Sequence, residues 1–315
     1  MNHLFYETGQ LEKIIESKTP HIDRVLFALA FTCDPEYFFD KTREMIGSAE
    51  SKWHGRIALL RAAIQINSGA FQAANKQLSM ISENSLVTGT MDSFYVSLYR
   101  LLKILADIEF QHVPPDFTTN KALIGDSHTM SLSRVWRGEG SKITYLPGVT
   151  LRGISFPLRN SYNVGIENAL TINQRLDDIV FSLGEIDIRN NYFYFRKITS
   201  NSGYKKIITS TIRAALSKIY AHKAPYQRFH IFALPGFNPS LVEENDKGNT
   251  NKVGSLYNFY RKEFNKAADD LGFLVVDHRE MFNKESVNNL IDHAHFHPRF
   301  YHDILNGYSN NIENK

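Results

Sequence analysis

A hydroxyl residue at a short turn is the first feature of this sequence that could do chemistry. Ser127 stands in the run Gly125-Asp126-Ser127-His128, directly after the apolar segment Ala122–Ile124. At a strand-to-helix turn, a glycine followed by a small hydroxyl residue presents the hydroxyl with little steric cover. It also aims the backbone N–H groups of the next helix at the same place. Such a hydroxyl becomes a nucleophile when an adjacent base takes its proton.

A histidine-rich segment near the end of the chain contains the candidate base. Asp292 and His295 are three residues apart, so the carboxylate can meet the imidazole on a loop or helical turn and hold its tautomer. His293 and His297 alternate with His295, and alternate residues of an extended segment share one face. These histidines could therefore ligate a metal together with Asp292 or Glu185. In that alternative, a metal-activated water replaces the serine as the nucleophile.

Polar groups at two other expected strand ends could contribute to the same site. Gly148 follows one apolar run and could offer an unobstructed backbone N–H. Glu185, Asp187 and Arg189 follow another, the run Ile179–Leu183, and place two carboxylates and a guanidinium after it. Two interpretations are open for these charges: a structural ion pair with the arginine, or a group that positions the substrate.

Simpler roles are open for several of these residues. Ser127 could be only the N-cap of a helix, since Ser and Asp at a strand-to-helix turn are ordinary capping residues. Asp126 is expected to cap the helix or hold the turn rather than act on a substrate. His128 is expected to line the site without a chemical role. Asn238, which also follows a strand end, is expected to face the pocket.

The elements that must position these residues follow from the hydrophobic pattern after Lys121. Short apolar runs alternate there with segments of helical periodicity, which predicts a parallel sheet covered on both faces. Reactive groups of such sheets gather beyond the carboxyl ends of the strands. The expected strands are Ala122–Ile124, Ile143–Leu146, Ile179–Leu183, His230–Leu234 and Phe273–Val276, and the expected helices include Lys205–Tyr220 and Ser255–Leu271.

The first part of the chain has the pattern of consecutive helices. Apolar residues recur there at three- and four-residue steps up to about Phe110. The segment Ala62–Leu78 resembles the second half of a tetratricopeptide repeat, and a generic helical domain with the same packing is the alternative. Pro114 and Pro115 cannot continue a helix. We therefore expect an α-helical domain over residues 1–112, a linker over 113–120 and an α/β domain over 121–315.

Over roughly Lys121 to Asn306, the chain resembles the SGNH, or GDSL-like, hydrolase superfamily. The first block of that family is a Gly-Asp-Ser motif after the first strand, matched here by Gly125-Asp126-Ser127. The last block is Asp-x-x-His near the C-terminus, matched by Asp292 and His295. The resemblance implies a flavodoxin-like three-layer α/β/α domain with a five-stranded parallel sheet.

The same resemblance implies roles for the matching residues. Ser127 would be the nucleophile, His295 the general base and then acid, and Asp292 the group that orients the imidazole. The backbone N–H groups of Ser127 and Gly148 would hold the oxyanion, with Gly153 as a competing candidate for the glycine position.

The third block departs from the family pattern. Gly-x-Asn-Asp is usual there, with the Asn side chain as a further oxyanion donor, whereas this sequence has Gly184-Glu185-Ile186-Asp187. Ile186 has no side-chain donor, so either another group replaces the Asn or the oxyanion is held less well. Arg189, which is always cationic, is the nearest substitute in the sequence.

The function implied by the resemblance is acyl-ester chemistry through an acyl-serine intermediate. Glu185, Asp187 and Arg189 would form a polar rim, which suits a carbohydrate better than a bare acyl chain. We therefore expect a serine-dependent esterase or O-acyltransferase that acts on acylated carbohydrate and uses no cofactor. The alternatives are a metal-dependent hydrolase and a catalytically weak or inactive protein that binds a protein partner through its helical part.

Composition narrows the class of protein. A chain of 315 residues with 43% hydrophobic and 22% charged residues is typical of a soluble globular protein. The net charge is only +3 and Lys/Arg clusters are lacking, which disfavours nucleic acid as a partner. The single cysteine, Cys33, cannot form an intrachain disulfide.

Met1–Lys18 lack the apolar core of a signal peptide, and the apolar stretch Val25–Cys33 is too short to span a bilayer, so we expect a cytoplasmic protein.

Overall fold

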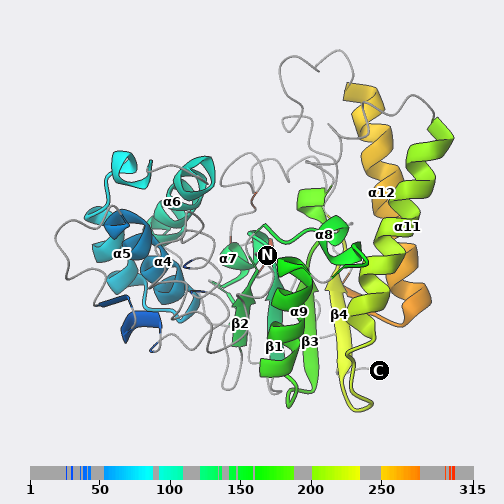
Figure 1. Ribbon diagram of the computed structural model, residues 1–315, viewed down its shortest axis with the longest axis horizontal. Coiled ribbons are helices and arrows are strands. Elements are labelled where there is room, and N and C mark those ends of the chain that lie inside the picture. The colour runs from blue at the N-terminus through cyan, green and yellow to red at the C-terminus, as the bar shows by residue number, and fades with distance from the viewer. Residues whose placement is uncertain are drawn as a thin grey trace.

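The computed structural model shows a helical region beside an α/β region (Figure 1). It describes residues 53–87, 92–108, 121–133, 135–136, 142–146, 148–158, 160–187, 201–234 and 250–276, with the single positions 26, 30, 36, 38–40, 42–43, 295, 298 and 300–301. Among these residues there is no helix with the length and apolar character needed to cross a bilayer.

Three α-helices make up most of the described N-terminal region. Helices α4 (His54–Asn67) and α5 (Phe71–Ser79) pack against each other. The turn between them places Gly69 at φ 82°, in the left-handed region that favours glycine. The short 3₁₀ helix η1 (Glu83–Leu86) leads to α6 (Asp92–Asp107), which packs on both α4 and α5. The predicted helical region is confirmed.

The core of the helical region contains one buried charge. Arg56 is fully buried, and its guanidinium lies 4.3 Å from the centre of the Tyr95 ring and donates to the carbonyl oxygen of Leu86. Arg56 also forms an ion pair with Asp92, so the buried cation is compensated. The tetratricopeptide likeness of residues 62–78 stays a prediction, although Ala74 and Leu78 of that segment are buried as helix pairing requires.

The α/β region is built on a parallel sheet of five strands within the described residues. Its order is β2-β1-β3-β4-β5, with every neighbouring pair parallel. This is the flavodoxin-like order, so the predicted fold class is confirmed. The strands are β1 (Lys121–Gly125), β2 (Lys142–Tyr145), β3 (Asp178–Ser182), β4 (Arg228–Phe232) and β5 (Leu274–Val276).

Alternate residues of the central strands enter two different cores. Ala122 and Ile124 of β1 join the larger one, which also holds residues of the helices on that face. Leu123 joins a smaller core on the opposite face with Trp136 and Phe300. The predicted covering of both faces is therefore confirmed. The helices on the larger face are α8 (Leu151–Ser155), α9 (Ser161–Ile172), α11 (Asn201–Tyr220) and α12 (Thr250–Leu271).

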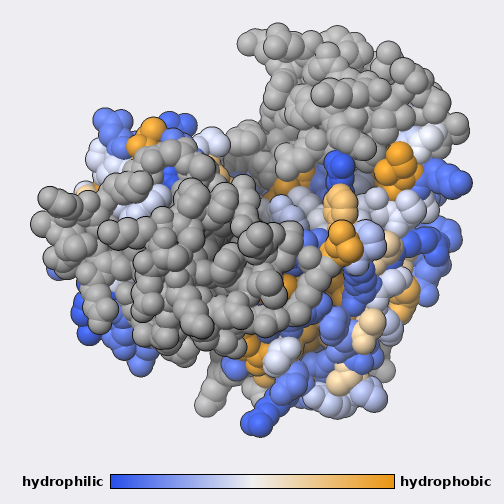
Figure 2. All heavy atoms as spheres, in the orientation of Figure 1, coloured by the Kyte–Doolittle hydropathy of each residue, from blue (hydrophilic) through white to orange (hydrophobic). Residues whose placement is uncertain are grey.

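Hydrophilic side chains dominate the visible exterior of the α/β region. Figure 2 shows apolar side chains dispersed among hydrophilic ones on the described part of that face. Exposed apolar residues such as Ile207, Tyr226 and Leu274 belong to three different elements or loops. Single apolar residues of this kind are normal on a surface in contact with water.

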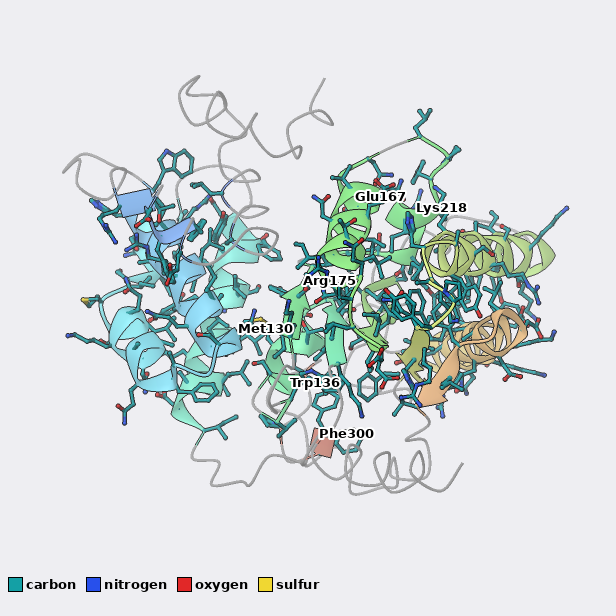
Figure 3. All side chains as sticks on the ribbon, turned by 90° about the horizontal axis from the view of Figure 1, so that it is seen from below. Met130, Trp136, Glu167, Arg175, Lys218 and Phe300 are labelled. Carbon is teal, nitrogen blue, oxygen red and sulfur yellow. The ribbon has the colours of Figure 1, made fainter. Side chains whose placement is uncertain are left out.

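The helical and α/β regions share one hydrophobic core. Met130, in helix α7 (His128–Leu132), and Tyr145, at the end of β2, are buried within the cluster formed by the N-terminal helices. Met130 lies at the junction of the two regions (Figure 3). Strand β2 is at the edge of the sheet, and the side chain of Tyr145 at its end joins the core of the helical region. The predicted domain boundaries stay a prediction.

A cluster of two buried side chains, Asp178 and His230, and the exposed Arg228 lies at the amino end of β3, away from the candidate site. Asp178 accepts two hydrogen bonds of 2.8 Å from Arg228, and its Oδ1 lies 2.7 Å from Nε2 of His230. Burial raises the pKa of Asp178, but the hydrogen bonds from His230 and Arg228 outweigh it and lower that pKa. Burial lowers the pKa of His230. A group whose pKa is lower in the folded state than in the unfolded state stabilises the fold at pH values above its unfolded-state pKa. This stabilisation is lost as the pH falls through the folded-state pKa.

We expect the Asp178→Asn substitution to lower the free energy of unfolding by about 1–3 kcal/mol, because it weakens the hydrogen bonds that the buried Asp178 accepts from His230 and Arg228. Urea unfolding at neutral pH measures this change. Asp177→Asn is the matched control, since the preceding aspartate is exposed and should change stability by no more than about 0.5 kcal/mol. Equal stabilities of the two variants would contradict the structural role of the cluster.

Candidate active site

The turn between β1 and α7 is held by backbone contacts that need a glycine. A Cβ on Gly125 would lie 2.2 Å from the carbonyl oxygen of Ser182 in the neighbouring strand. One residue later, the N–H of Asp126 donates to that same oxygen at 3.0 Å. The Asp126 carboxylate accepts from the N–H of His128 at 3.0 Å. The expectation that Asp126 caps the helix is therefore confirmed.

Ser127 occupies the N-cap position of α7 without capping it. Its backbone is in the right-handed helical region, with φ −59° and ψ −21°, and its side chain makes no capping hydrogen bond. The capping interaction comes from Asp126. Ser127 therefore lies at the carboxyl end of β1 without a capping hydrogen bond, and its role stays a prediction.

The topology explains why this position can be a site. Strands β2 and β3 flank β1 on opposite sides, so the connections after β1 and β3 leave the sheet toward opposite neighbours. A crevice forms outside the strand ends at such a switch point, and ligands of open α/β sheets bind there. Ser127 follows β1 and Glu185 follows β3, which places both residues at this point.

Two glycines after β2 compete for the role of oxyanion donor, and they differ in their surroundings. A Cβ on Gly148, whose φ is +63°, would meet no atom within 4 Å. Gly153 instead lies against the ring of Tyr162, and its N–H donates to the Thr150 hydroxyl at 3.0 Å. The open surroundings of Gly148 favour it over Gly153.

Asp187, in the helical residues 185–187 after β3, contacts the start of α8. Its two carboxylate oxygens accept from the backbone N–H groups of Leu151 and Arg152 at 2.6 and 2.9 Å, and the side chain is fully buried. Negative charge at a helix N-terminus is stabilising. The carboxylate thus holds the segment that contains Gly148 next to the end of β3. Its predicted role in substrate binding stays a prediction.

His128 is the centre of a buried polar cluster. Its Nδ1 lies 3.0 Å from the hydroxyl of Tyr301, and its Nε2 lies 3.3 Å from a carboxylate oxygen of Glu185. The ring centre of His295 lies 5.1 Å from that of His128, with 45° between the planes. The structure therefore brings together three residues predicted for one site: His128, Glu185 and His295.

Burial, with nearby carboxylates as a second cause, keeps the phenols of two tyrosines protonated. Burial, with the Asp126 carboxylate as a second cause, raises the pKa of Tyr145. Burial also raises the pKa of Tyr301 well above its ordinary value, with the charges of Asp126 and Glu185 adding to the shift. At neutral pH both side chains can therefore donate hydrogen bonds.

Other predicted residues lie outside the described part of the chain. These are Asp292, Arg189 and Asn238, and also His293 and His297 of the metal alternative. The described residues contain no group of three side chains arranged to hold a metal ion. Ile186 is described and is partly exposed beside Asp187, where its aliphatic side chain has no hydrogen-bond donor.

Tyr301 is a site residue that is not predicted from the sequence. It lies outside the Asp292–His295 block and belongs to no motif, and only the folded chain brings it to His128. Tyr145 is also missed, although a signal was available. It ends the β2 strand and is in register with Gly125, so the rule about strand ends could have indicated it.

About 60% of the chain is similar to solved structures of hydrolases. No protein-family model matches the chain, and no curated protein matches its sequence. LAE5, an alpha/beta hydrolase enzyme from the metagenome of Lake Arreo, Spain, has 12% identity and a TM-score of 0.40 over 60% of this chain and 92% of its own. The lipase Lip_vut3 from a goat rumen metagenome has 16% identity and a TM-score of 0.39 over 59% and 94%. Axe2, an acetylxylan esterase from Geobacillus stearothermophilus, has 16% identity and a TM-score of 0.37 over 61% and 93%.

Proposed function

We propose that the chain is a serine-dependent ester hydrolase or O-acyltransferase of the SGNH type, with Ser127 as its nucleophile. The observation that carries this proposal is the Ser127 hydroxyl. It stands at the β1 end of the topological switch point, while Asp126 does the capping that a serine there would ordinarily do. The buried imidazole of His295 lies against the residue that follows Ser127.

The proposed reaction has two half-steps. His295 takes the proton of the Ser127 hydroxyl as its oxygen attacks the ester carbonyl carbon, which forms a tetrahedral oxyanion. The carbon–oxygen bond to the alcohol then breaks, and His295 gives its proton to the departing oxygen. In the second half-step, water or another hydroxyl attacks the acyl-serine with His295 again as base, and Ser127 recovers its proton. Asp292 would orient the imidazole.

The proposed oxyanion site uses the backbone N–H groups of Ser127 and Gly148. Each correctly aimed donor contributes about 2.7–4 kcal/mol to transition-state stabilisation. The open space beside Gly148 supports this assignment. Because Ile186 stands where an asparagine donor is usual in the family, a third donor would have to come from elsewhere, and Arg189 is our candidate.

Acylated carbohydrate is the proposed substrate class. Glu185, Asp187 and His128 are all buried and in contact with protein groups. We therefore assign these three to the floor of the site, beneath the substrate. Arg189 and Asn238 are the proposed residues for direct contact with the sugar, through hydrogen bonds to its hydroxyl groups.

The test of this function combines labelling and turnover. We expect a fluorophosphonate probe to label the purified protein at Ser127, as identified by peptide mass spectrometry, and acetylated sugars to be hydrolysed. Acetyl-CoA with a sugar acceptor tests transfer, and 1,10-phenanthroline tests the metal alternative. Failure to label and to turn over any ester or acetyl donor would refute the proposal. Loss of activity on chelation alone would support the metal-dependent hydrolase.

A further inference from the structure

We propose that His128 is a positioning residue that, held by Glu185 and Tyr301, fixes the imidazole ring of His295 for proton transfer. This inference rests on the proposed function, because it assumes that His295 exchanges a proton with Ser127. It assigns to His128 a part in the reaction beyond contact with the substrate.

The contacts of His128 fix its ring from both nitrogens. Tyr301 lies 3.0 Å from Nδ1 and Glu185 lies 3.3 Å from Nε2, and all three side chains are buried. A ring held at both nitrogens cannot rotate about its Cβ–Cγ bond without breaking one of these contacts. His128 therefore presents a fixed ring to its neighbours.

The chemistry of the partners determines the proton positions. A carboxylate has only acceptors, so in the proposal the proton of the neutral His128 ring is on Nε2, the nitrogen that lies 3.3 Å from Glu185. Nδ1 is then an acceptor in the neutral ring, and it receives the hydroxyl proton of Tyr301. The raised pKa of Tyr301 is consistent with this direction of donation, because the phenol keeps its proton. The cluster thus forms a directed chain from Tyr301 through His128 to Glu185.

Nδ1 of His128 faces Tyr301 and Nε2 faces Glu185, so the contact of His128 with a third residue is made through the ring. The ring of His295 lies there, 5.1 Å away and tilted by 45°. Tilted and edge-to-face pairs at this distance are attractive and restrict the orientation of both rings. Because His128 is fixed, it limits the rotation of His295, and the orientation of an imidazole decides which nitrogen faces the nucleophile.

The position of His128 in the chain adds a second constraint. It follows Ser127 directly, and its own N–H is bound by Asp126. His128 therefore connects the backbone of Ser127, the proposed nucleophile, with the ring of His295, the proposed base. Displacement of His128 would move both reacting groups, and an error of about 1 Å in such geometry can lower a rate by about 100-fold.

The test compares the rates of ester hydrolysis of variants at Tyr301 and Glu185, the two residues that contact the nitrogens of His128. We expect Glu185→Ala to lower kcat by about 10- to 100-fold with little change in KM. Glu185→Gln should recover most of the loss, because glutamine keeps an acceptor oxygen next to Nε2 of His128. Tyr301→Phe, which keeps the ring, should lower kcat less than Glu185→Ala. Glu83→Ala removes an exposed carboxylate that pairs with Arg100 in the helical region, and it should leave kcat unchanged.

The outcomes separate this inference from the proposed function. Fluorophosphonate labelling of Ser127 in the wild type, with wild-type kcat in Glu185→Ala, would overturn the positioning role and leave the function standing. An equal loss of kcat in Glu185→Gln and Glu185→Ala would also overturn the positioning role and leave the function standing. Absence of labelling in the wild type would overturn the function itself. Circular dichroism and the melting temperature establish that each variant is folded, and Tyr301→Phe provides the test if Glu185→Ala is not.

Discussion

The Ser127→Ala substitution is expected to lower kcat/KM for ester hydrolysis by a factor on the order of 10⁴ to 10⁶, as removal of the nucleophile does in serine hydrolases. The substitution removes the hydroxyl oxygen that would bind the acyl group in the proposed acyl-enzyme. The backbone N–H groups stay in place. Those donors and substrate binding should leave a residual rate above the uncatalysed one. Steady-state kinetics on a nitrophenyl ester, with the variant purified free of wild type, measure the loss.

The structure offers a matched control for this experiment. Ser131 lies one turn later in α7, is fully buried, and has no hydrogen bond from its hydroxyl within the described part of the chain. Ser131→Ala therefore removes a serine hydroxyl from the same helix without loss of a contact, and it should keep near wild-type activity. If Ser127→Ala were as active as Ser131→Ala, another group would have to be the nucleophile.

The Gly125→Ala substitution is expected to destabilise the fold by about 4 kcal/mol or more, above the 1–3 kcal/mol usual for overpacking. The added methyl group would lie 2.2 Å from the Ser182 carbonyl oxygen and 2.7 Å from Cγ2 of Thr129. The first of these atoms is backbone of the adjacent strand, so relief requires β1 and β3 to separate. Denaturant unfolding measures the change, and a midpoint shift at constant slope would assign it to stability.

Gly165→Ala is the control for this prediction. A Cβ at Gly165, inside helix α9, would lie 3.5 Å from the nearest atom, Cδ2 of Leu146, which is ordinary contact. Alanine is favoured over glycine within a helix by roughly 0.5–1 kcal/mol. We expect this variant to be as stable as the wild type or more so. A Gly125→Ala protein that unfolds at the same denaturant concentration would contradict the close approach of β1 and β3.

The sheet was predictable from the sequence because strands buried on both faces need apolar residues at nearly every position. The strand β3 illustrates this, since all five of its residues are buried and three of them form the run Ile179–Phe181. Short helices such as α8 gave no such signal. Five residues cannot display a helical period, and α8 is held by Asp187, which is more than 30 residues away in the sequence.

The candidate site could be predicted from the sequence only where its residues lie close together in the chain. Ser127 and Asp126 lie in one turn, so their capping chemistry and their motif are visible together. The choice between Gly148 and Gly153 needed the folded structure, because it depends on the Thr150 hydroxyl and the Tyr162 ring. Tyr301 is separated from His128 by more than half the chain, and no local pattern reports a contact of that range.

The shared core of the two regions has a consequence for the order of folding. Met130 and Tyr145 are part of the hydrophobic cluster of the N-terminal helices, although both follow the first strand of the sheet. During synthesis, the helical region is made first and domains generally fold as units in that order. Here the helices lack two of their buried side chains until the edge strand has been made. The native packing of the first region is therefore completed only after the turn that contains Ser127 has been synthesised.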